Sequence, residues 1–217
     1  MAYLHWLAHE IAGVVRANRF WMTWNLLLAG FPAALALVLF ARPHRRTLGW
    51  WVGVGVFALF LPNAPYVLTD LLHLRGDVSS AASDGVVVAG VLPLYGAFVL
   101  AGFIAYLISV ELAIREVRSV RPGLSRWPIE LAIHLVCSIG VVVGRISRLN
   151  SWDTAANPSS TAERIFSTLT WRGAPVAVAA VFVAVVLTYG VVRILVTAVA
   201  HTTASLYHRL RPAPAVA

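Results

Sequence analysis

Long apolar runs separated by short polar segments organise this chain. Four runs are long enough to cross a bilayer, at residues 20–41, 85–110, 127–144 and 175–198. A fifth run, 48–61, would be only about 20 Å long as a helix, against a hydrocarbon core of roughly 30 Å. Helices satisfy their own backbone hydrogen bonds in lipid. We therefore predict an all-α fold, a polytopic membrane bundle of about five transmembrane helices.

Shorter elements flank these spans. Residues 1–19 contain an amphipathic pattern over 3–17 that predicts an interfacial helix, followed by a membrane bundle over 20–199 and a disordered tail over 212–217. Residues 75–84 read as a polar loop, with Ser83 or Asp84 as the N-cap of the next span. Ser160 and Glu163 fit a capping box that opens a short helix within 154–172. We treat residues 1–217 as one domain.

Composition supports a membrane protein and sets its orientation. The 217 residues are 59% hydrophobic and 12% charged, and the net charge of +8 comes from arginine without any lysine. These arginines stand at the ends of apolar runs, where they suit lipid headgroups, so we expect no nucleic-acid partner. Ten lie on the side of loops 42–47 and 111–126, and seven on the other. The positive-inside rule then predicts an outer N-terminus and a cytoplasmic C-terminus.

The unusual stretch lies at residues 61–74, where two prolines follow the short span. Residues that precede proline avoid the α region, so we expect Leu61 and Ala64 to leave it and the helix to end near Phe60. Because this span is short, residues 63–66 are expected at membrane depth, lining a cavity covered by protein.

If helix resumes at Tyr66, then Tyr66, Asp70 and His73 share one polar stripe. A second polar segment, 144–153, follows the fourth span. Arg145 and Arg148 share a helical face there, and a pair of guanidinium forks suits phosphate or carboxylate. With five spans, both polar segments fall on the same side of the membrane. Anchoring at headgroups is the alternative explanation for the arginines.

Three interpretations of Asp70 and His73 stay open. They suit general acid–base catalysis as a carboxylate–imidazole pair. Asp70 would otherwise form a structural ion pair with Arg145 or Arg148. Oxygen ligands from Asp153, Asp77 or Asp84 would complete a metal shell, but we predict no metal ion and no cofactor.

A further group of ionisable residues lies at the opposite end of the bundle. Glu130 and His134 are spaced i, i+4 within the fourth span, and Glu111 ends the third span on the same side. Ionisable groups inside spans are functional candidates. Glu130 is one turn from the interface, which favours a solvated end, and His134 is expected to be a hydrogen-bonded core histidine.

Both polar strings resemble those of domain-of-unknown-function family 1361, bacterial multi-pass membrane proteins. The resemblance extends over residues 20–175 and rests on the string 61–66, on Thr69, Asp70, His73 and Leu74, and on Gly144, Arg145, Arg148 and the string 150–153. Relatives carry an aromatic pair where Ala82 and Ser83 precede Asp84 here. The resemblance implies a bacterial inner-membrane location and this choice of site, without supplying a reaction.

The leading functional prediction is an outer-face polar pocket that binds an anionic lipid headgroup or a partner membrane protein. Its candidate substrate-binding residues are Asn63, Tyr66, Arg145, Arg148, Asn150 and Asp153, beside Asp70 and His73. The alternative is an enzyme acting on a lipid-linked or phosphorylated substrate, with Asp70 and His73 as the catalytic acid–base pair. A small transporter is the third interpretation, and it requires polar residues through the midplane.

Overall fold

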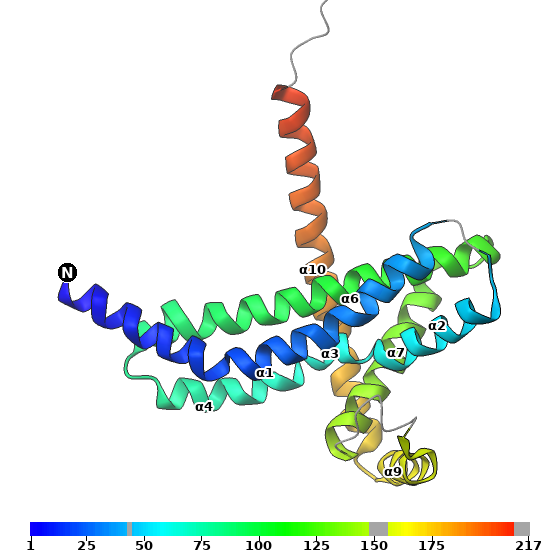
Figure 1. Cartoon of the computed structure of the whole chain (residues 1–217), viewed down its shortest axis with the longest axis horizontal. Coiled ribbons are helices and arrows are strands. Elements are labelled where there is room, and N and C mark those ends of the chain that lie inside the picture. Colours follow the sequence, from blue (N-terminus) through cyan, green and yellow to red (C-terminus); the bar gives the residue numbers. More distant parts are fainter. Residues whose placement is uncertain (43–44, 148–155, 211–217) are drawn as a thin grey trace, which may run out of the picture.

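The chain is helical almost throughout (Figure 1). The computed structural model describes residues 1–42, 45–147 and 156–210, and these ranges contain no β-strand. Five helical stretches in them are long and apolar enough to cross a membrane: Ala2–Phe40, Leu48–Ser80, Asp84–Val120, Arg126–Ser147 and Ala174–Ser205. The predicted all-α, multi-pass architecture is therefore confirmed.

Two long helices, α1 (Ala2–Phe40) and α6 (Leu92–Val120), run side by side in the same direction and form the axis of the molecule (Figure 1). The predicted interfacial helix and the first span are one continuous helix, α1. A short helix, α5 (Asp84–Val86), and a π-helical turn, η2 (Val87–Val91), lead into α6. Ser83 is the N-cap, as predicted, because its hydroxyl accepts the Val86 N–H at 3.4 Å.

The chain returns along this pair through α2 (Leu48–Phe60), α3 (Asn63–Tyr66), the 3₁₀ turn η1 (Thr69–Leu71) and α4 (Leu72–Ser80). Helix α2 ends at Phe60, as predicted. The expectation that Leu61 and Ala64 leave the α region was wrong: Leu61 has φ −54° and ψ −38°, and Ala64 lies within α3. The chain accommodates both prolines by tightening, with i→i+3 bonds such as Ala64 N to Leu61 O at 3.2 Å.

The polar loop predicted over 75–84 was also wrong, because α4 continues to Ser80. Tertiary hydrogen bonds hold this polar segment in helix. Asp77 accepts from the Asn18 amide at 2.7 Å and from the Tyr95 hydroxyl at 3.1 Å. Partners on α1 and α6 thus override the weak helix propensity of the glycine and serines.

The remaining helices are α7 (Arg126–Ser147), α9 (Pro158–Thr170) and α10 (Ala174–Leu210), and α10 crosses the long axis of the bundle steeply (Figure 1). The predicted capping box was wrong. Asn157 is the N-cap of α9 and Pro158 occupies its first turn, so Ser160 already lies inside the helix. The tail 212–217 lies outside the described residues.

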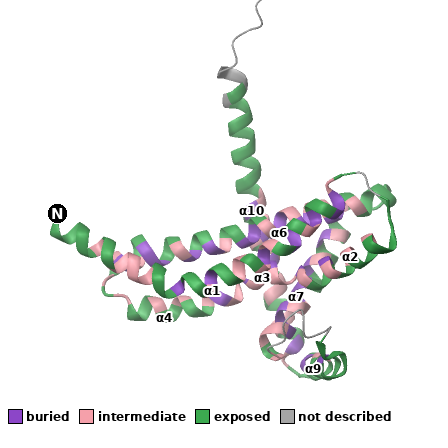
Figure 2. Cartoon of the chain, viewed as in Figure 1, coloured by how far each residue is buried: buried purple, intermediate pink, exposed green. Residues whose placement is uncertain are grey.

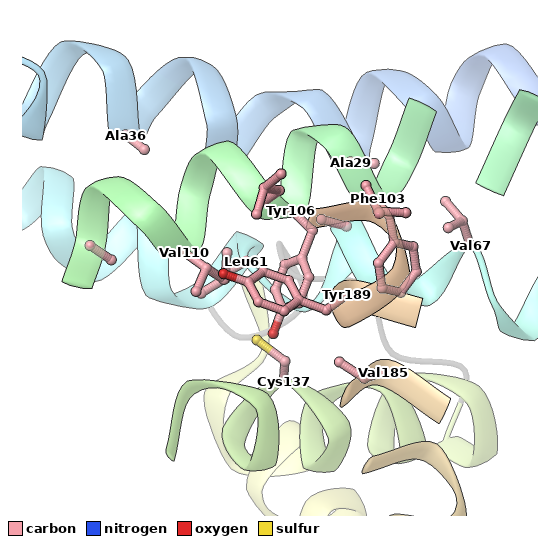
Figure 3. Packing of buried hydrophobic residues seen from close by; sticks show 14 of the residues in the cluster. Ala29, Ala36, Leu61, Val67, Phe103, Tyr106, Val110, Cys137, Val185 and Tyr189 are labelled. Atoms are coloured by element: carbon pink, nitrogen blue, oxygen red, sulfur yellow. The ribbon is translucent and has the colours of Figure 1, made fainter. Parts of the chain in front are cut away.

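The core lies where α1, α3, α6, α7 and α10 meet (Figure 3). Tyr106, Tyr189 and Cys137 are buried there together with Leu61 and Val110. Exposed residues cover the outward faces of the helices and the C-terminal half of α10 (Figure 2), and many of them are large and apolar. Outward apolar faces are what helices surrounded by lipid require.

Candidate functional site

Asp70 is the most buried ionisable residue of the first polar string, with 2% of its surface exposed. It lies in η1, which the close approach of Val67 to Gly102 of α6 holds in place. The Asn25 amide of α1 donates to one carboxylate oxygen at 2.8 Å. The Arg145 guanidinium, in the last turn of α7, lies 3.8 Å from the other oxygen. Three helical segments thus meet at one carboxylate.

His73 is one turn further along, and its ring is fixed from two sides. Its Nδ1 lies 3.1 Å from the backbone carbonyl oxygen of Asp70, and its ring stacks on Trp21 of α1 at a centroid distance of 4.9 Å. The Asp70 carboxylate therefore accepts its side-chain hydrogen bond from Asn25. The His73 ring bonds instead to the backbone carbonyl of Asp70. We call Asn25, Asp70, His73 and Arg145 the Asp70 cluster.

A second carboxylate, that of Asp77, extends the Asp70 cluster along α4. The sequence analysis had placed Asp77 in a polar loop. Asp77 accepts from Asn18 and Tyr95, and the Trp21 indole N–H donates to the Asn18 side-chain oxygen at 2.8 Å. Asn18, Trp21 and Asn25 are spaced i, i+3 and i+7 on α1. That polar stripe at the start of an apolar span is the signal that could have revealed both asparagines.

The other predicted site residues have varied outcomes. The Asn63 amide donates to the Phe60 carbonyl at 2.9 Å, which satisfies the end of α2. Tyr66 is half-buried, and its backbone carbonyl accepts the Thr69 hydroxyl at 2.8 Å. Arg148, Asn150 and Asp153 lie outside the described residues. The structure therefore brings Asp70, His73 and Arg145 together, and the binding or catalytic roles of all eight residues stay predictions.

Charged residues also gather at the far end of α7, in what we call the Glu111 cluster. The Arg126 guanidinium donates to Glu111 at 2.8 Å, to Glu130 at 2.7 Å and to the Tyr189 hydroxyl at 3.2 Å. Arg193 of α10 lies 3.7 Å from Glu111 and 3.6 Å from Glu130. The solvated end expected for Glu130 was wrong: it is 5% exposed, because both arginines cover it.

His134 is a core histidine, as predicted. It is 1% exposed, and its Nδ1 lies 2.8 Å from the Tyr106 hydroxyl oxygen. Its ring meets Tyr189 edge to face at 4.6 Å. This buried group joins the Glu111 cluster to the core shown in Figure 3.

The two clusters occupy opposite ends of α7. Arg126 and Arg145 are separated by about 28 Å along the helix at 1.5 Å per residue, close to the hydrocarbon thickness of roughly 30 Å. In the Glu111 cluster, carboxylates and guanidinium groups satisfy one another. In the Asp70 cluster, the guanidinium is over a third exposed and only loosely paired. Over the described ranges, no three histidine, cysteine, aspartate or glutamate side chains form a metal-binding group.

Comparison with known proteins places this geometry within one family. The model of a family described as proteins of unknown function (DUF1361) matches residues 24–189. The match includes both polar strings and extends from the C-terminal part of α1 to the middle of α10. No curated protein and no solved structure matches the chain.

Proposed function

We propose that this chain, which belongs to the DUF1361 family of proteins of unknown function, is a membrane protein that binds the phosphate of an anionic lipid headgroup at Arg145. One observation carries the proposal. The Arg145 side chain is 36% exposed, and its carboxylate neighbour lies 3.8 Å away, beyond hydrogen-bond distance. Among the described residues, no acceptor takes a hydrogen bond from its guanidinium, so the fork is available for a bidentate phosphate contact.

Asp70 and Asn25 support this role by positioning. The Asn25 amide holds the Asp70 carboxylate at 2.8 Å, and the carboxylate in turn keeps the Arg145 head group beside it. Because Asp70 is 2% exposed, it orients the guanidinium from the protein side and leaves the outer side to a ligand. In the sequence, Arg148 follows three positions later and would add a second guanidinium group for the phosphate.

The location that goes with this proposal is a bacterial inner membrane, with the N-terminus outside and the C-terminus in the cytoplasm. The arginine distribution supports that orientation through the positive-inside rule. It assigns the Asp70 cluster to the outer side and the Glu111 cluster to the cytoplasmic side.

The enzyme alternative receives less support from this geometry. A general base needs its carboxylate or imidazole aimed at the substrate proton. The Asp70 carboxylate is buried between Asn25 and Arg145, and His73 Nδ1 is directed at the Asp70 carbonyl. A catalytic role for Asp70 would therefore need its contacts to open when substrate binds, whereas His73 would act through Nε2, which its Nδ1 contact leaves as the acceptor nitrogen.

The transporter alternative requires a polar route that joins the two ends of the bundle. Tyr106, His134 and Tyr189 extend the Glu111 cluster inward. Between His134 and Arg145, α7 contributes the consecutive buried valines 141–143. This apolar stretch separates the two polar clusters and argues against a continuous pathway.

Lipid retention tests the headgroup proposal. The protein is purified from its native membrane in a mild detergent, and the lipids that co-elute are identified and counted by mass spectrometry. We expect the wild type to retain anionic phospholipid above its abundance in the membrane. Arg145→Gln should reduce this excess, and Arg145→Lys should reduce it less, because a lysine keeps the charge without the fork.

Arg75→Gln is the matched control, since Arg75 is exposed on α4 at the same end of the bundle. It removes the same charge and should leave retention unchanged. Equal retention by wild type and Arg145→Gln would overturn the proposal. A protein that co-purifies with the wild type and is lost from Arg145→Gln, with lipids unchanged, would indicate a partner membrane protein at this site instead.

A further inference from the structure

A deep apolar groove lies between α2, α6 and α7, away from the Asp70 cluster. Its volume is about 670 Å³, within the range of roughly 300–1,000 Å³ that is usual for ligand pockets. Its walls are formed by aliphatic and aromatic side chains, among them Trp51, Val54, Ala58, Val117 and Ile133. Among the described residues that line it, only Arg46 and Glu116 have charged side chains, and the two form an ion pair.

The groove arises from the way the short second crossing is attached. Helix α2 packs chiefly on α1, whereas α3 packs on α1, α6 and α7 together. Pro62, just before α3, lies against Gly140 so closely that a Cβ there would be 2.7 Å from the proline ring. The lining of the groove reaches Leu61 and Cys137, which are close to this contact in the sequence. Along the groove, the small side chains of Ala58 and Ala132 leave the space between α2 and α7 unfilled.

The mouth of the groove carries strong positive charge. Six exposed arginines belong to the segments that flank it: Arg42, Arg45, Arg46, Arg115, Arg118 and Arg121. Glu116 is the only acidic residue in segments 42–50 and 113–125. It pairs with Arg46 at 2.9 Å, and the Arg46 guanidinium also lies 5.8 Å above the Trp50 ring. The six arginines and one glutamate give these two segments a net charge of +5.

We infer that the groove is a second lipid site, which holds an acyl chain of an anionic phospholipid with its phosphate at the arginines of the mouth. An acyl chain gains little by leaving the bilayer for an apolar groove, because both surroundings are apolar. Affinity for one lipid class must therefore come from the headgroup, and charge complementarity selects an anionic one. The site does not depend on Arg145, since it lies towards the opposite end of α7.

The test uses purified protein in detergent with an equimolar mixture of phosphatidylglycerol and phosphatidylcholine, and native mass spectrometry to count each bound lipid. The wild type should retain phosphatidylglycerol in preference to phosphatidylcholine. Because each basic residue contributes about fivefold to the binding of anionic lipid, Arg46→Gln should reduce the preference by about that factor. The double variant Arg46→Gln/Glu116→Gln removes one positive and one negative charge, so it leaves the net charge of the mouth unchanged and should keep the wild-type preference.

Groove-filling variants test the acyl-chain part. Ala58→Phe and Ala132→Phe place a ring in the groove and should reduce retention of both lipids. Ala180→Phe, on the exposed face of α10, is the matched control and should retain the wild-type amount. An unchanged thermal unfolding midpoint and a single elution peak show that each variant is folded.

Two results would overturn the inference: equal retention of the two lipids by the wild type, or undiminished phosphatidylglycerol on both groove-filling variants. Arg145→Gln should leave the preference for phosphatidylglycerol in this assay partly intact, because the groove still contributes. If Arg145→Gln abolishes the preference and the groove variants do not affect it, the headgroup site at Arg145 stands and the groove site fails.

Discussion

Gly140 of α7 lies directly against Pro62, at the turn between α2 and α3. A Cβ at position 140 would be 2.7 Å from the proline Cγ, closer than non-bonded carbons approach. Gly140→Ala should therefore destabilise the protein by about 1–3 kcal/mol through overpacking, measured by unfolding in sodium dodecyl sulfate. Gly96→Ala on α6 is the control, because its Cβ would meet nothing within 4 Å, and it should be neutral or stabilising. Equal stability of Gly140→Ala and wild type would show that the contact is not rigid.

The hydrogen bond between Asn25 and Asp70 should be a measurable part of the stability. Asn25→Ala and Asp70→Ala should each cost roughly 1–3 kcal/mol, because each removes one partner of a hydrogen bond to a buried carboxyl group. The double variant should cost less than the sum of the two. Glu163→Ala, exposed on α9, combined with Asn25→Ala provides an additive control. Additivity of Asn25→Ala with Asp70→Ala would mean that the two side chains do not interact.

Arg126 should resist replacement by lysine. Its guanidinium bridges Glu111, Glu130 and Tyr189, and a single ammonium group cannot reach all three. We expect Arg126→Lys to lose about 1.5–3 kcal/mol in the same unfolding assay. Arg121→Lys, at an exposed position in the preceding turn, should behave like the wild type. If the two variants are equally stable, Arg126 acts only as a point charge.

Cysteine labelling tests the orientation. Ser80 and Ser119 are both exposed, near the ends of α4 and α6. With a membrane-impermeant thiol reagent on intact cells, Ser80→Cys should be labelled from outside and Ser119→Cys only after permeabilisation. The wild type serves as the unlabelled control, because its one cysteine, Cys137, is fully buried. The reverse pattern would place the N-terminus in the cytoplasm, and labelling of both from one side would contradict two opposed clusters.

Several features of the site followed from the sequence. The i, i+3 spacing of Asp70 and His73 and the parity of the spans indicated that Asp70 and Arg145 lie on one side, and the two are 3.8 Å apart. The sequence analysis missed Asn25 and assigned Asp77 to a loop. Asn25 is 45 residues from Asp70, and nothing local to either residue identifies the other as its partner.

Local rules failed where tertiary contacts decide the outcome. Leu61 stays in the α region although a proline follows, because the buried turn between α2 and α3 packs against α1, α6 and α7. Residues 72–80 form α4 although their composition suits a loop, because Asp77 has partners on α1 and α6. Glu130 is buried although it lies one turn from a span end, because Arg126 and Arg193 cover it.

By itself, the sequence determined the all-α membrane architecture, the five apolar stretches and the end of the short second crossing at Phe60. Apolar length and proline position suffice for this, because a backbone in lipid must satisfy its hydrogen bonds within each helix. Only the tertiary structure decided which polar side chains pair, that Arg145 keeps an accessible guanidinium while Arg126 is fully engaged, and that a groove remains between α2 and α7. These depend on contacts between helices distant in the chain, where small residues such as Gly140 set how closely the backbones approach.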